Sequence, residues 1–440
     1  MAESGIARAR RAQLVLDQVA RDAASSSSAE PFRDALAMLT IMAREEPVVE
    51  SAYARRFYEL ASDAVVRAGG DLAEAEEVLR CVEGILRLNA PFDLDCYMLF
   101  TEWNRDPSKQ FWLPRRDVLM PVCEGFQDLA DDLLDVLTVS LPPRVGKSTT
   151  GIFAVTWQMG RHPLDSNVMS GHSDKLTKNF HMEALGIISD AYTYRFREVF
   201  PDARMVGSSM AEETVSLVRE GRFPTLTCRA VKGTLTGAVE VGHNGLLYCD
   251  DMVSDREEAL SADRMDKLYD AYLSQLFDRK LSGAKEVHVG TRWVPNDVIG
   301  RVVESNAGSR RCRTIVIPAL DGVPWSEVMG RREAEDRHAF VSEDLGDGTV
   351  VVEHPWGRSN FEYKFGTGFD TFYYENVRRK LEEAGAADSW WAKYMGAPYW
   401  IDGLMFPESE LKFYDELPEG EPDGVIAVCD TKDRGADYAV

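Results

Sequence analysis

The sequence of 440 residues has no run of about 20 apolar residues, and this absence excludes a transmembrane helix. Its seven cysteines form no CxxC pair, so we expect neither a disulfide framework nor a zinc site. Basic residues are outnumbered, with 50 Lys and Arg against 73 Asp and Glu and a net charge of −23. A protein that coats DNA non-specifically is usually basic, so binding to nucleic acid would require a local patch or an assembly. The start of the chain contains no continuous apolar stretch, which argues against a signal peptide and predicts an intracellular protein.

Apolar residues in the first hundred positions recur at three- and four-residue spacing, the pattern of amphipathic helices. We expect helices over Ala35–Ala43, Ala52–Val66 and Ala73–Leu88. This part of the sequence contains no set of residues that points to catalysis. We therefore interpret residues 1–100 as a helical region for docking or regulation.

From about Leu133 onward, short apolar or β-branched runs alternate with segments of helical pattern. Buried strands that alternate with helices predict an α/β fold with a mostly parallel sheet covered by helices on both faces. Strands are expected at Leu134–Leu141, Ser166–Ser170, Leu226–Val231, Gly245–Cys249, Glu286–Val289 and Arg313–Ile317. Helices are expected at Thr149–Met159, Asp263–Leu276 and Asp370–Lys393, and an excursion or hairpin around Val350–Val352.

The string LPPRVGKS at Leu141–Ser148 lies directly after a predicted strand and directly before a predicted helix. It matches the phosphate-loop pattern G-x-x-x-x-G-K-[ST], except that leucine stands at the first glycine. Gly146 lets backbone N–H groups turn toward a β-phosphate at a helix N-terminus. Lys147 reaches the β- and γ-phosphates, and the Ser148 hydroxyl holds Mg²⁺. The predicted nucleotide-binding loop also includes Val145 and Thr149.

Arg144 is an unusual residue within this loop. A cation there would lie close to the γ-phosphate and could stabilise the charge of the transition state, as an arginine finger does. An equally good alternative is that Arg144 pairs with a surface acid or contacts the loop backbone.

The string LLYCDD at Leu246–Asp251 is an apolar strand that ends in two carboxylates. A carboxylate at the tip of a strand beside a phosphate loop is where Mg²⁺ needs an acidic partner, so Asp250 is the predicted metal-side residue. The adjacent Asp251 is the candidate base that polarises the attacking water. The alternative is a pair of acids that begins an ordinary surface loop.

The string EVHVGTRW at Glu286–Trp293 is a third strand end with small and polar groups. Thr291 can hydrogen-bond a phosphate or the lytic water, and Arg292 could be a second phosphate sensor. Ligands bind at the carboxyl edge of a doubly wound parallel sheet, where three such strand ends would meet. Taken alone, the string is only a strand followed by a turn.

The strings LPPRVGKS, LLYCDD and GTRWVPNDVIG occur in an order and at separations that resemble the large terminase subunits of tailed phages. These proteins are ATP-driven motors that package DNA into a procapsid. The string WWAKYMGAPYWIDGLMF at Trp390–Phe406 is similar to the family's passage from motor to nuclease. The resemblance extends from about Phe111 to the end of the chain. It implies a P-loop NTPase motor domain over residues 101–400, followed by a linker over 401–423.

This resemblance also implies roles for individual residues. Lys147 and Ser148 take the positions of the phosphate and Mg²⁺ residues, and Asp250 that of the metal-side acid. Asp251 stands where the family usually has a hydrolytic Glu, one methylene longer.

Other positions are implied in the same way. Thr291 takes the position that couples hydrolysis to movement, and Arg144 that of an internal arginine finger. Gln110 precedes the motor as the family's adenine-contacting Gln does, and a surface Gln is an equally good alternative. Ser170–Lys178 and Gly233–Gly237 lie on segments that face DNA in related translocases, or they are ordinary turns and helix caps.

The cofactors implied by the resemblance are ATP and Mg²⁺. The partners are double-stranded DNA, the portal protein, the small terminase subunit and further copies of the chain in a homo-oligomeric ring. The location is the host cytoplasm, with transient docking on the procapsid and no attachment to a membrane. The basic stretch Arg310–Arg313 either contributes DNA contacts or is a solvated loop before a strand.

The family's second domain is an RNase H-like nuclease that holds two divalent metals. Residues 424–440 resemble its first strand, with Asp430 at the position of the first metal ligand and Asp437 as a candidate neighbour. The remaining acids of such a domain would come from later strands. We therefore expect ATPase activity without nuclease activity from these residues, and endonuclease activity only from a longer chain.

Two other functions are compatible with the same motor-core motifs. A helicase- or repair-type DNA translocase shares the core, although the sequence after Pro318 has no pattern for a second RecA-like domain. A non-catalytic nucleotide-binding assembly protein is the other alternative, in which Leu141 and Asp251 mark a decayed site.

Overall fold

The structure, a computed structural model, describes residues 5–45, 51–232, 239–320, 341–344, 350–353 and 358–399. The chain divides into two compact units, Met1–Tyr399 and Trp400–Val440, and every described element belongs to the first. Several predictions concern residues outside the described ranges: the loop 233–237, the linker 401–423, and the nuclease strand in 424–440 with Asp430 and Asp437. No helix of the described ranges is long and apolar enough to cross a membrane.

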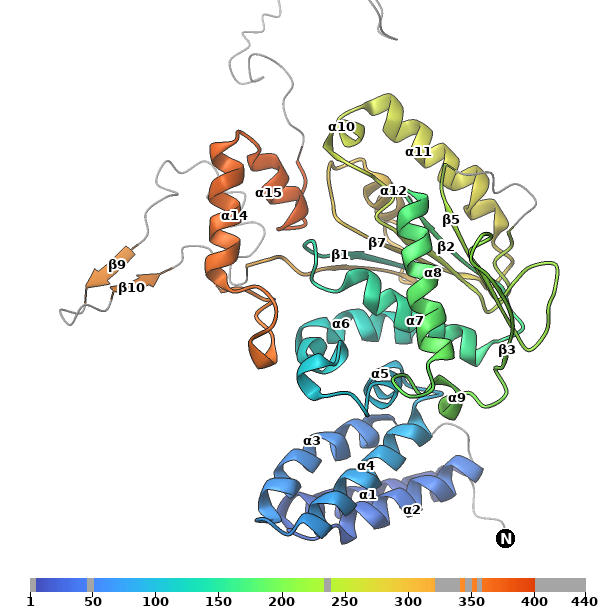
Figure 1. The fold of residues 1–440 in the computed structure, drawn as a ribbon, viewed down its shortest axis with the longest axis vertical. Helices are drawn as coiled ribbons and strands as arrows, with labels where there is room; N and C mark the ends of the chain where they lie inside the picture. Colours follow the sequence, from blue (N-terminus) through green and yellow to red (C-terminus); the bar gives the residue numbers. More distant parts are fainter. Residues whose placement is uncertain are drawn as a thin grey trace, which may run out of the picture. The chain divides into compact units, whose positions relative to one another are not determined.

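A central sheet of eight strands organises the first unit (Figure 1). Its strands are β1 (Val136–Ser140), β2 (Asn167–Gly171), β3 (Met205–Ser209), β4 (Thr214–Leu217), β5 (Leu226–Ala230), β6 (Leu246–Asp250), β7 (Lys285–Gly290) and β8 (Cys312–Val316). They lie in the order β3-β4-β5-β2-β6-β7-β1-β8. The six strands from β5 to β8 are parallel, and β3 and β4 extend one edge in antiparallel pairing. Strand β1, which precedes the predicted phosphate loop, and strand β6, which ends in the two acids, are therefore separated by β7.

Helices surround this sheet and precede it. The N-terminal helices are α1 (Gly5–Ser25), α2 (Glu30–Glu45), α3 (Ser51–Arg67), α4 (Leu72–Asn89) and α5 (Leu94–Thr101). The helices within the α/β part are α6 (Trp112–Ala130), α7 (Lys147–Arg161), α8 (Asp174–Ser189), α9 (Phe196–Val199), α10 (Arg256–Ala259), α11 (Ala262–Gln275) and α12 (Val298–Ser305). The β9–β10 hairpin (Val341–Asp344 and Val350–Glu353) comes next, followed by α14 (Thr371–Glu383) and α15 (Ala387–Lys393). Short 3-10 turns occur at Pro107–Lys109, Phe277–Arg279 and Lys364–Gly366.

Side chains of strand β6 alternate between two hydrophobic cores. Leu246 and Tyr248 join the core that includes α6, α7 and α8, whereas Leu247 and Cys249 join the core that includes α11 and α12. Every residue of β6 is buried. A strand buried on both faces has the near-continuous apolar sequence expected of a parallel sheet between helical layers. The predicted α/β architecture, with a mostly parallel sheet covered on both faces, is confirmed.

The predicted elements are found with shifted ends. All six predicted strands exist, with bounds that differ by at most two residues. The predicted hairpin around Val350–Val352 is β9–β10. The single helix predicted over Asp370–Lys393 is two helices, because Gly385 adopts a φ of 68° and ends α14. Strands β3 and β4 were not predicted.

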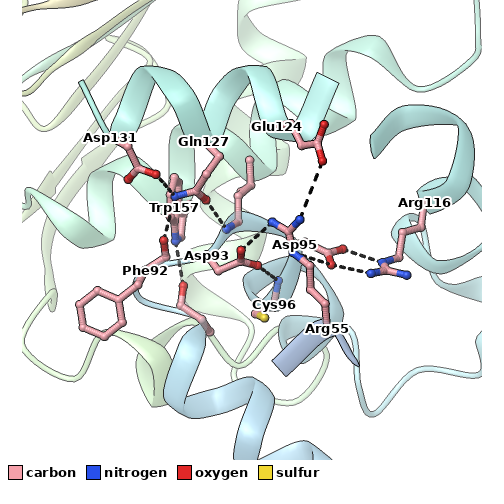
Figure 2. Close-up of polar contacts among 12 residues, drawn as sticks. Arg55, Phe92, Asp93, Asp95, Cys96, Arg116, Glu124, Gln127, Asp131 and Trp157 are labelled. Atoms are coloured by element: carbon pink, nitrogen blue, oxygen red, sulfur yellow. Dashed lines mark hydrogen bonds and ion pairs between the residues drawn. The ribbon is translucent and has the colours of Figure 1, made fainter. Parts of the chain in front are cut away.

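The N-terminal helices share one continuous hydrophobic core with the sheet, from Leu16 of α1 to Trp390 of α15. Their junction with the α/β part also contains a buried polar cluster, drawn in Figure 2. Asp95 of α5 accepts hydrogen bonds from the Trp112 indole at 2.6 Å and from the Arg116 guanidinium at 2.8 and 2.9 Å. Arg55 of α3 donates to Asp93 at 2.7 Å. These contacts fix the N-terminal helices to α6.

Candidate functional site

The loop between β1 and α7 alternates in backbone handedness. Arg144 and Gly146 are left-handed, with φ of 66° and 107°, and Val145 between them is not. Such alternation turns successive N–H groups to one side and forms a concavity that binds anions. Helix α7 begins at Lys147, so its free N–H groups and the positive end of its dipole lie at the same place. Positive φ values beside a helix N-terminus are features of anion-binding loops, and phosphate binding by this loop stays a prediction.

Two independent constraints require glycine at position 146. Its φ of 107° lies in the region that L side chains rarely adopt. A Cβ there would also approach a ring carbon of Phe111 to 2.8 Å. The Phe111 ring in turn stacks on Phe153 of α7, with ring centroids 5.8 Å apart. The loop thus packs closely against the segment that precedes α6.

Lys147, Asp251 and Thr291 come together at the carboxyl ends of β1, β6 and β7. The Lys147 ammonium donates to Thr291 Oγ1 at 2.6 Å and to the Leu141 carbonyl at 3.2 Å, and lies 3.8 Å from Asp251 Oδ1. The Thr291 N–H donates to the same Asp251 oxygen at 2.8 Å. Because Lys147 is only 7% exposed, these interactions operate in a partly dehydrated environment. The structure brings these three predicted residues into one cluster.

Asp250 lies beside this cluster and is fully buried. Neither carboxylate oxygen has a hydrogen bond of good geometry, although Ser148 interacts with the group closely enough to lower its pKa. Burial and the neighbouring charge of Asp251 raise the pKa of Asp250 to about 7, and Ser148 and Lys147 oppose that rise. A buried carboxylate without a good partner is a fitting ligand for a divalent cation, whose charge would favour the ionised form.

The donor set also fits the way proteins bind Mg²⁺ with a nucleotide. Among the described residues, no group of three or more His, Cys, Asp or Glu side chains could hold a metal ion. Mg²⁺ at phosphate sites uses one or two carboxylates together with substrate phosphates and water, rather than an all-protein cage. Ser148 and Asp250, which interact with each other, match that smaller set.

Asp251 is held by its main chain as well as its side chain. Its φ is 42°, its N–H donates to the Val289 carbonyl at 2.9 Å, and its carbonyl is 2.7 Å from His172 Nδ1. His172 belongs to the segment Ser170–Lys178. In the same segment, Ser173 caps α8 by accepting the Leu176 N–H. In the structure this segment contains a turn and a helix cap, as one of the two alternatives predicted. Its contact with DNA stays a prediction.

Arg144, in the loop between β1 and α7, and Arg292, in the loop after β7, have different surroundings. Arg144 is exposed on the predicted phosphate loop. Burial raises the pKa of Tyr394, and the nearby charge of Arg144 opposes that rise. Arg292 donates from Nε to both carboxylate oxygens of Asp297, at 2.9 and 3.0 Å, and from Nη2 to the Val294 and Pro295 carbonyls. These contacts support the loop after β7, and the role of Arg292 as a second phosphate sensor stays a prediction.

Gln110 lies next to Phe111, whose ring contacts the phosphate loop. Its side-chain amide donates to the carbonyls of Glu102 and Arg105, at 3.1 and 3.0 Å. These bonds orient the Gln110 side chain, and its adenine-contacting role stays a prediction. Val145 is buried, whereas Thr149 is half-buried in the first turn of α7.

Two residues that support the loop, Glu102 and Tyr363, were not identified from the sequence. Glu102, which is 1% exposed, accepts the N–H groups of Phe111 and Trp112 and thereby caps the start of α6. Tyr363 donates its hydroxyl to the Val145 carbonyl at 2.9 Å, although the two residues are 218 positions apart. Neither contact follows from a local pattern.

The basic stretch Arg310–Arg313 provides little free positive charge. Arg311 donates to Asp132 and Asp135, and Arg313 pairs with Asp128. These pairs link the start of β8 to the residues that precede β1. Arg311 and Arg313 are thus paired with acids, and contact of this stretch with DNA stays a prediction.

A scan of the chain against protein-family models finds no match, and a search of the curated proteins finds none either. The resemblance to the large terminase subunits thus rests on the motifs quoted above and stays a prediction.

Proposed function

We propose that the chain is an ATP-hydrolysing motor that moves double-stranded viral DNA into a procapsid, the function of a large terminase subunit. The observation that best supports ATP hydrolysis is the cluster of Lys147, Asp251 and Thr291 beside a cradle of backbone N–H groups. The DNA-packaging part of the proposal is supported by the motif resemblance alone.

In this proposal the β- and γ-phosphates of ATP bind in the loop from Arg144 to Ser148. Phosphate oxygens would compete with Thr291 and the Leu141 carbonyl for the Lys147 ammonium. Mg²⁺ held by Ser148 and Asp250 would neutralise phosphate charge. In this proposal the exposed Arg144 would stabilise the charge that develops on the γ-phosphate in the transition state.

Asp251 is the proposed base, and Thr291 the proposed coupling residue. The Thr291 N–H holds one carboxylate oxygen of Asp251, which orients the group toward an attacking water. The Thr291 hydroxyl contacts Lys147, so the three residues share a single hydrogen-bonded chain. Loss of the γ-phosphate would move the Lys147 ammonium. Because Thr291 is hydrogen-bonded to both Lys147 and Asp251, this movement would shift Asp251 and the end of β7 as well.

The charge of the chain limits how it could hold DNA. A net charge of −23 opposes phosphate contacts, and Arg311 and Arg313 are already paired with acids. Affinity for DNA depends on the number of phosphates neutralised, so we expect weak binding by an isolated chain. A homo-oligomeric ring, docked on the portal protein with the small terminase subunit, would add many weak contacts at once.

The first test is Mg²⁺-dependent ATP turnover by the wild type and by two variants, Lys147→Ala and Asp250→Asn. We expect each substitution to reduce turnover by roughly a hundredfold or more, because Lys147 would stabilise phosphate charge directly and Asp250 would hold the Mg²⁺ that neutralises it. The matched controls, Lys267→Ala and Asp263→Asn, remove an exposed ion pair of α11 and should retain wild-type turnover. Unchanged turnover in both site variants would refute the site assignment.

The same preparations separate the remaining functions. ATP-driven movement of double-stranded DNA into procapsids would support the proposal directly. Strand unwinding on a forked duplex would instead indicate a helicase-type motor. Nucleotide binding without turnover would indicate a non-catalytic assembly protein.

A further inference from the structure

Tyr363 joins a distant part of the chain to the phosphate loop. The Tyr363 side chain is buried, and its hydroxyl donates to the Val145 carbonyl at 2.9 Å. The segment around it folds back on itself, since the Tyr363 N–H donates to Thr367 and the Phe369 N–H to Phe361. The Tyr363 hydroxyl thereby connects the segment from Phe361 to Phe369 to the loop between β1 and α7.

A cation between two aromatic rings strengthens this contact. The Arg115 guanidinium lies 4.8 Å from the ring centroid of Phe111 and 5.1 Å from that of Tyr363. It also donates to the Phe111 carbonyl at 2.8 Å. Nearby, Lys364 pairs with Asp117 of α6 at 2.8 Å. Phe111 therefore packs on Gly146 while Tyr363 holds the carbonyl of the preceding residue, with Arg115 between the two rings.

The phenol of Tyr363 is a donor over the whole physiological pH range. Burial raises its pKa well above the ordinary value, and the charge of Arg115 lowers it by less. The phenol therefore stays protonated. Because a carbonyl oxygen can only accept a hydrogen bond, the Tyr363 hydroxyl must be the donor.

The geometry of a trans peptide gives this hydrogen bond a consequence for the ligand. The peptide bond between Val145 and Gly146 is trans, so its C=O and N–H groups point in opposite directions. A carbonyl held toward Tyr363 therefore directs the Gly146 N–H to the other side. We propose that Tyr363 is a positioning residue that aims the Gly146 N–H at the β-phosphate of a bound nucleotide. This inference rests on the proposed nucleotide site.

The test is equilibrium binding of ATP, ADP and AMP to the full chain and to its Tyr363→Phe variant, together with ATP turnover. We expect affinity for ATP and ADP to fall roughly three- to tenfold, the effect of one hydrogen bond. AMP has no β-phosphate, so its affinity should not change. KM for ATP should rise while kcat stays within about twofold, because the lost interaction is present in both ground and transition states.

Tyr374→Phe is the matched control. The Tyr374 hydroxyl is buried in the same part of the chain but has no hydrogen-bond partner among the described residues, so its removal breaks no bond. This variant should bind all three nucleotides as the wild type does.

Two results would overturn the inference while leaving the proposed function intact: wild-type affinity of Tyr363→Phe for ATP and ADP, or an equal loss of affinity for AMP. The second result would indicate general damage to the fold. If the wild type neither binds nor hydrolyses ATP, and Lys147→Ala changes nothing, the proposed function fails and the inference fails with it.

Discussion

At the scale of single residues, the backbone of Asp251 favours a short polar side chain at this position. Its φ of 42° is left-handed, a conformation that costs most residues roughly 1–2 kcal/mol. Asp tolerates this region better, because its short side chain hydrogen-bonds locally. In the fold, Asp251 Oδ1 also accepts the N–H of Thr291, which is remote in sequence, and lies 3.8 Å from the Lys147 ammonium.

We therefore predict that Asp251→Asn and Asp251→Glu both reduce turnover. Asn retains the shape but loses the base, which should lower kcat by roughly a hundredfold or more and leave nucleotide affinity within a few-fold. Glu retains the charge but strains the backbone and displaces the carboxylate from Thr291. The measurement is kcat together with the dissociation constant for ATP. A Glu variant as active as the wild type would show that the left-handed backbone does not select Asp.

Residue positions in this site were predictable only where a local pattern exists. Lys147, Asp251 and Thr291 each follow a strand within a short string, and parallel strands bring such ends to one edge. Glu102 and Tyr363 support the loop from remote positions through contacts that only the tertiary fold creates. The pairing of Arg292 with Asp297 is another contact that the string EVHVGTRW does not reveal.

At the scale of elements, the six parallel strands were predictable and the antiparallel strands β3 and β4 were not. The strands from β5 to β8 have apolar runs that reflect burial between two helical layers, except where β8 is partly exposed at the sheet edge. Strand β3 is largely exposed, and its sequence MVGSS contains glycine and serine, which disfavour strands or leave them without a signal. β3 and β4 form because they pair with each other and with β5, an interaction that no local pattern records.

A buried ionic cluster surrounds Glu286 near the start of β7, whereas the candidate site lies at the other end of this strand. Glu286 accepts hydrogen bonds from His288, from Tyr272 and from Lys280, the last at 2.7 Å. Burial alone would raise the pKa of Glu286, but His288 and Lys280 lower it to about 2. A carboxyl with a depressed pKa stabilises the fold above its unfolded pKa, and this stabilisation is lost as the pH falls through the folded pKa.

We predict that Glu286→Gln lowers the free energy of unfolding at pH 7 by about 3 kcal/mol. The deficit should shrink as the pH is lowered from about 4.5 toward 2, because the wild-type carboxylate becomes protonated over that interval. Urea unfolding of the two proteins at several pH values measures both quantities. Glu304→Gln changes an exposed carboxylate of α12 and is the control. A deficit that does not depend on pH would show that the charge of Glu286 is not the source of stability.

At the scale of the whole molecule, the N-terminal helices and the sheet are physically continuous. Their side chains form one hydrophobic core, and the Trp157 indole of α7 donates to the Ala90 carbonyl at 2.8 Å. Helix α7 begins at the phosphate loop. The helices that sequence analysis assigned to docking or regulation thus contact an element of the candidate site, and a partner that moves them would act on α7 directly.

Substitution of Asp95 tests whether the N-terminal helices and the sheet lose stability together. Asp95 is fully buried and binds the guanidinium of Arg116 through both oxygens, with Arg55 at 3.6 Å (Figure 2). Removing one partner of a buried ion pair leaves an uncompensated charge, which typically costs about 3–5 kcal/mol. We therefore predict that Asp95→Asn destabilises the sheet as well as the N-terminal helices, and that Asp63→Asn, at an exposed position of α3, has little effect.

Hydrogen exchange measured separately for amides of α4 and of β1 distinguishes a shared from a local loss of stability. If the two parts form one cooperative unit, Asp95→Asn should reduce the protection of both by a similar free energy, because both open through the same global transition. Loss of protection in α4 with unchanged protection in β1 would show that the helices unfold on their own. In that case a partner bound to the N-terminal helices could not reach the phosphate loop through stability alone, and its effect would have to pass through the Trp157 contact of α7.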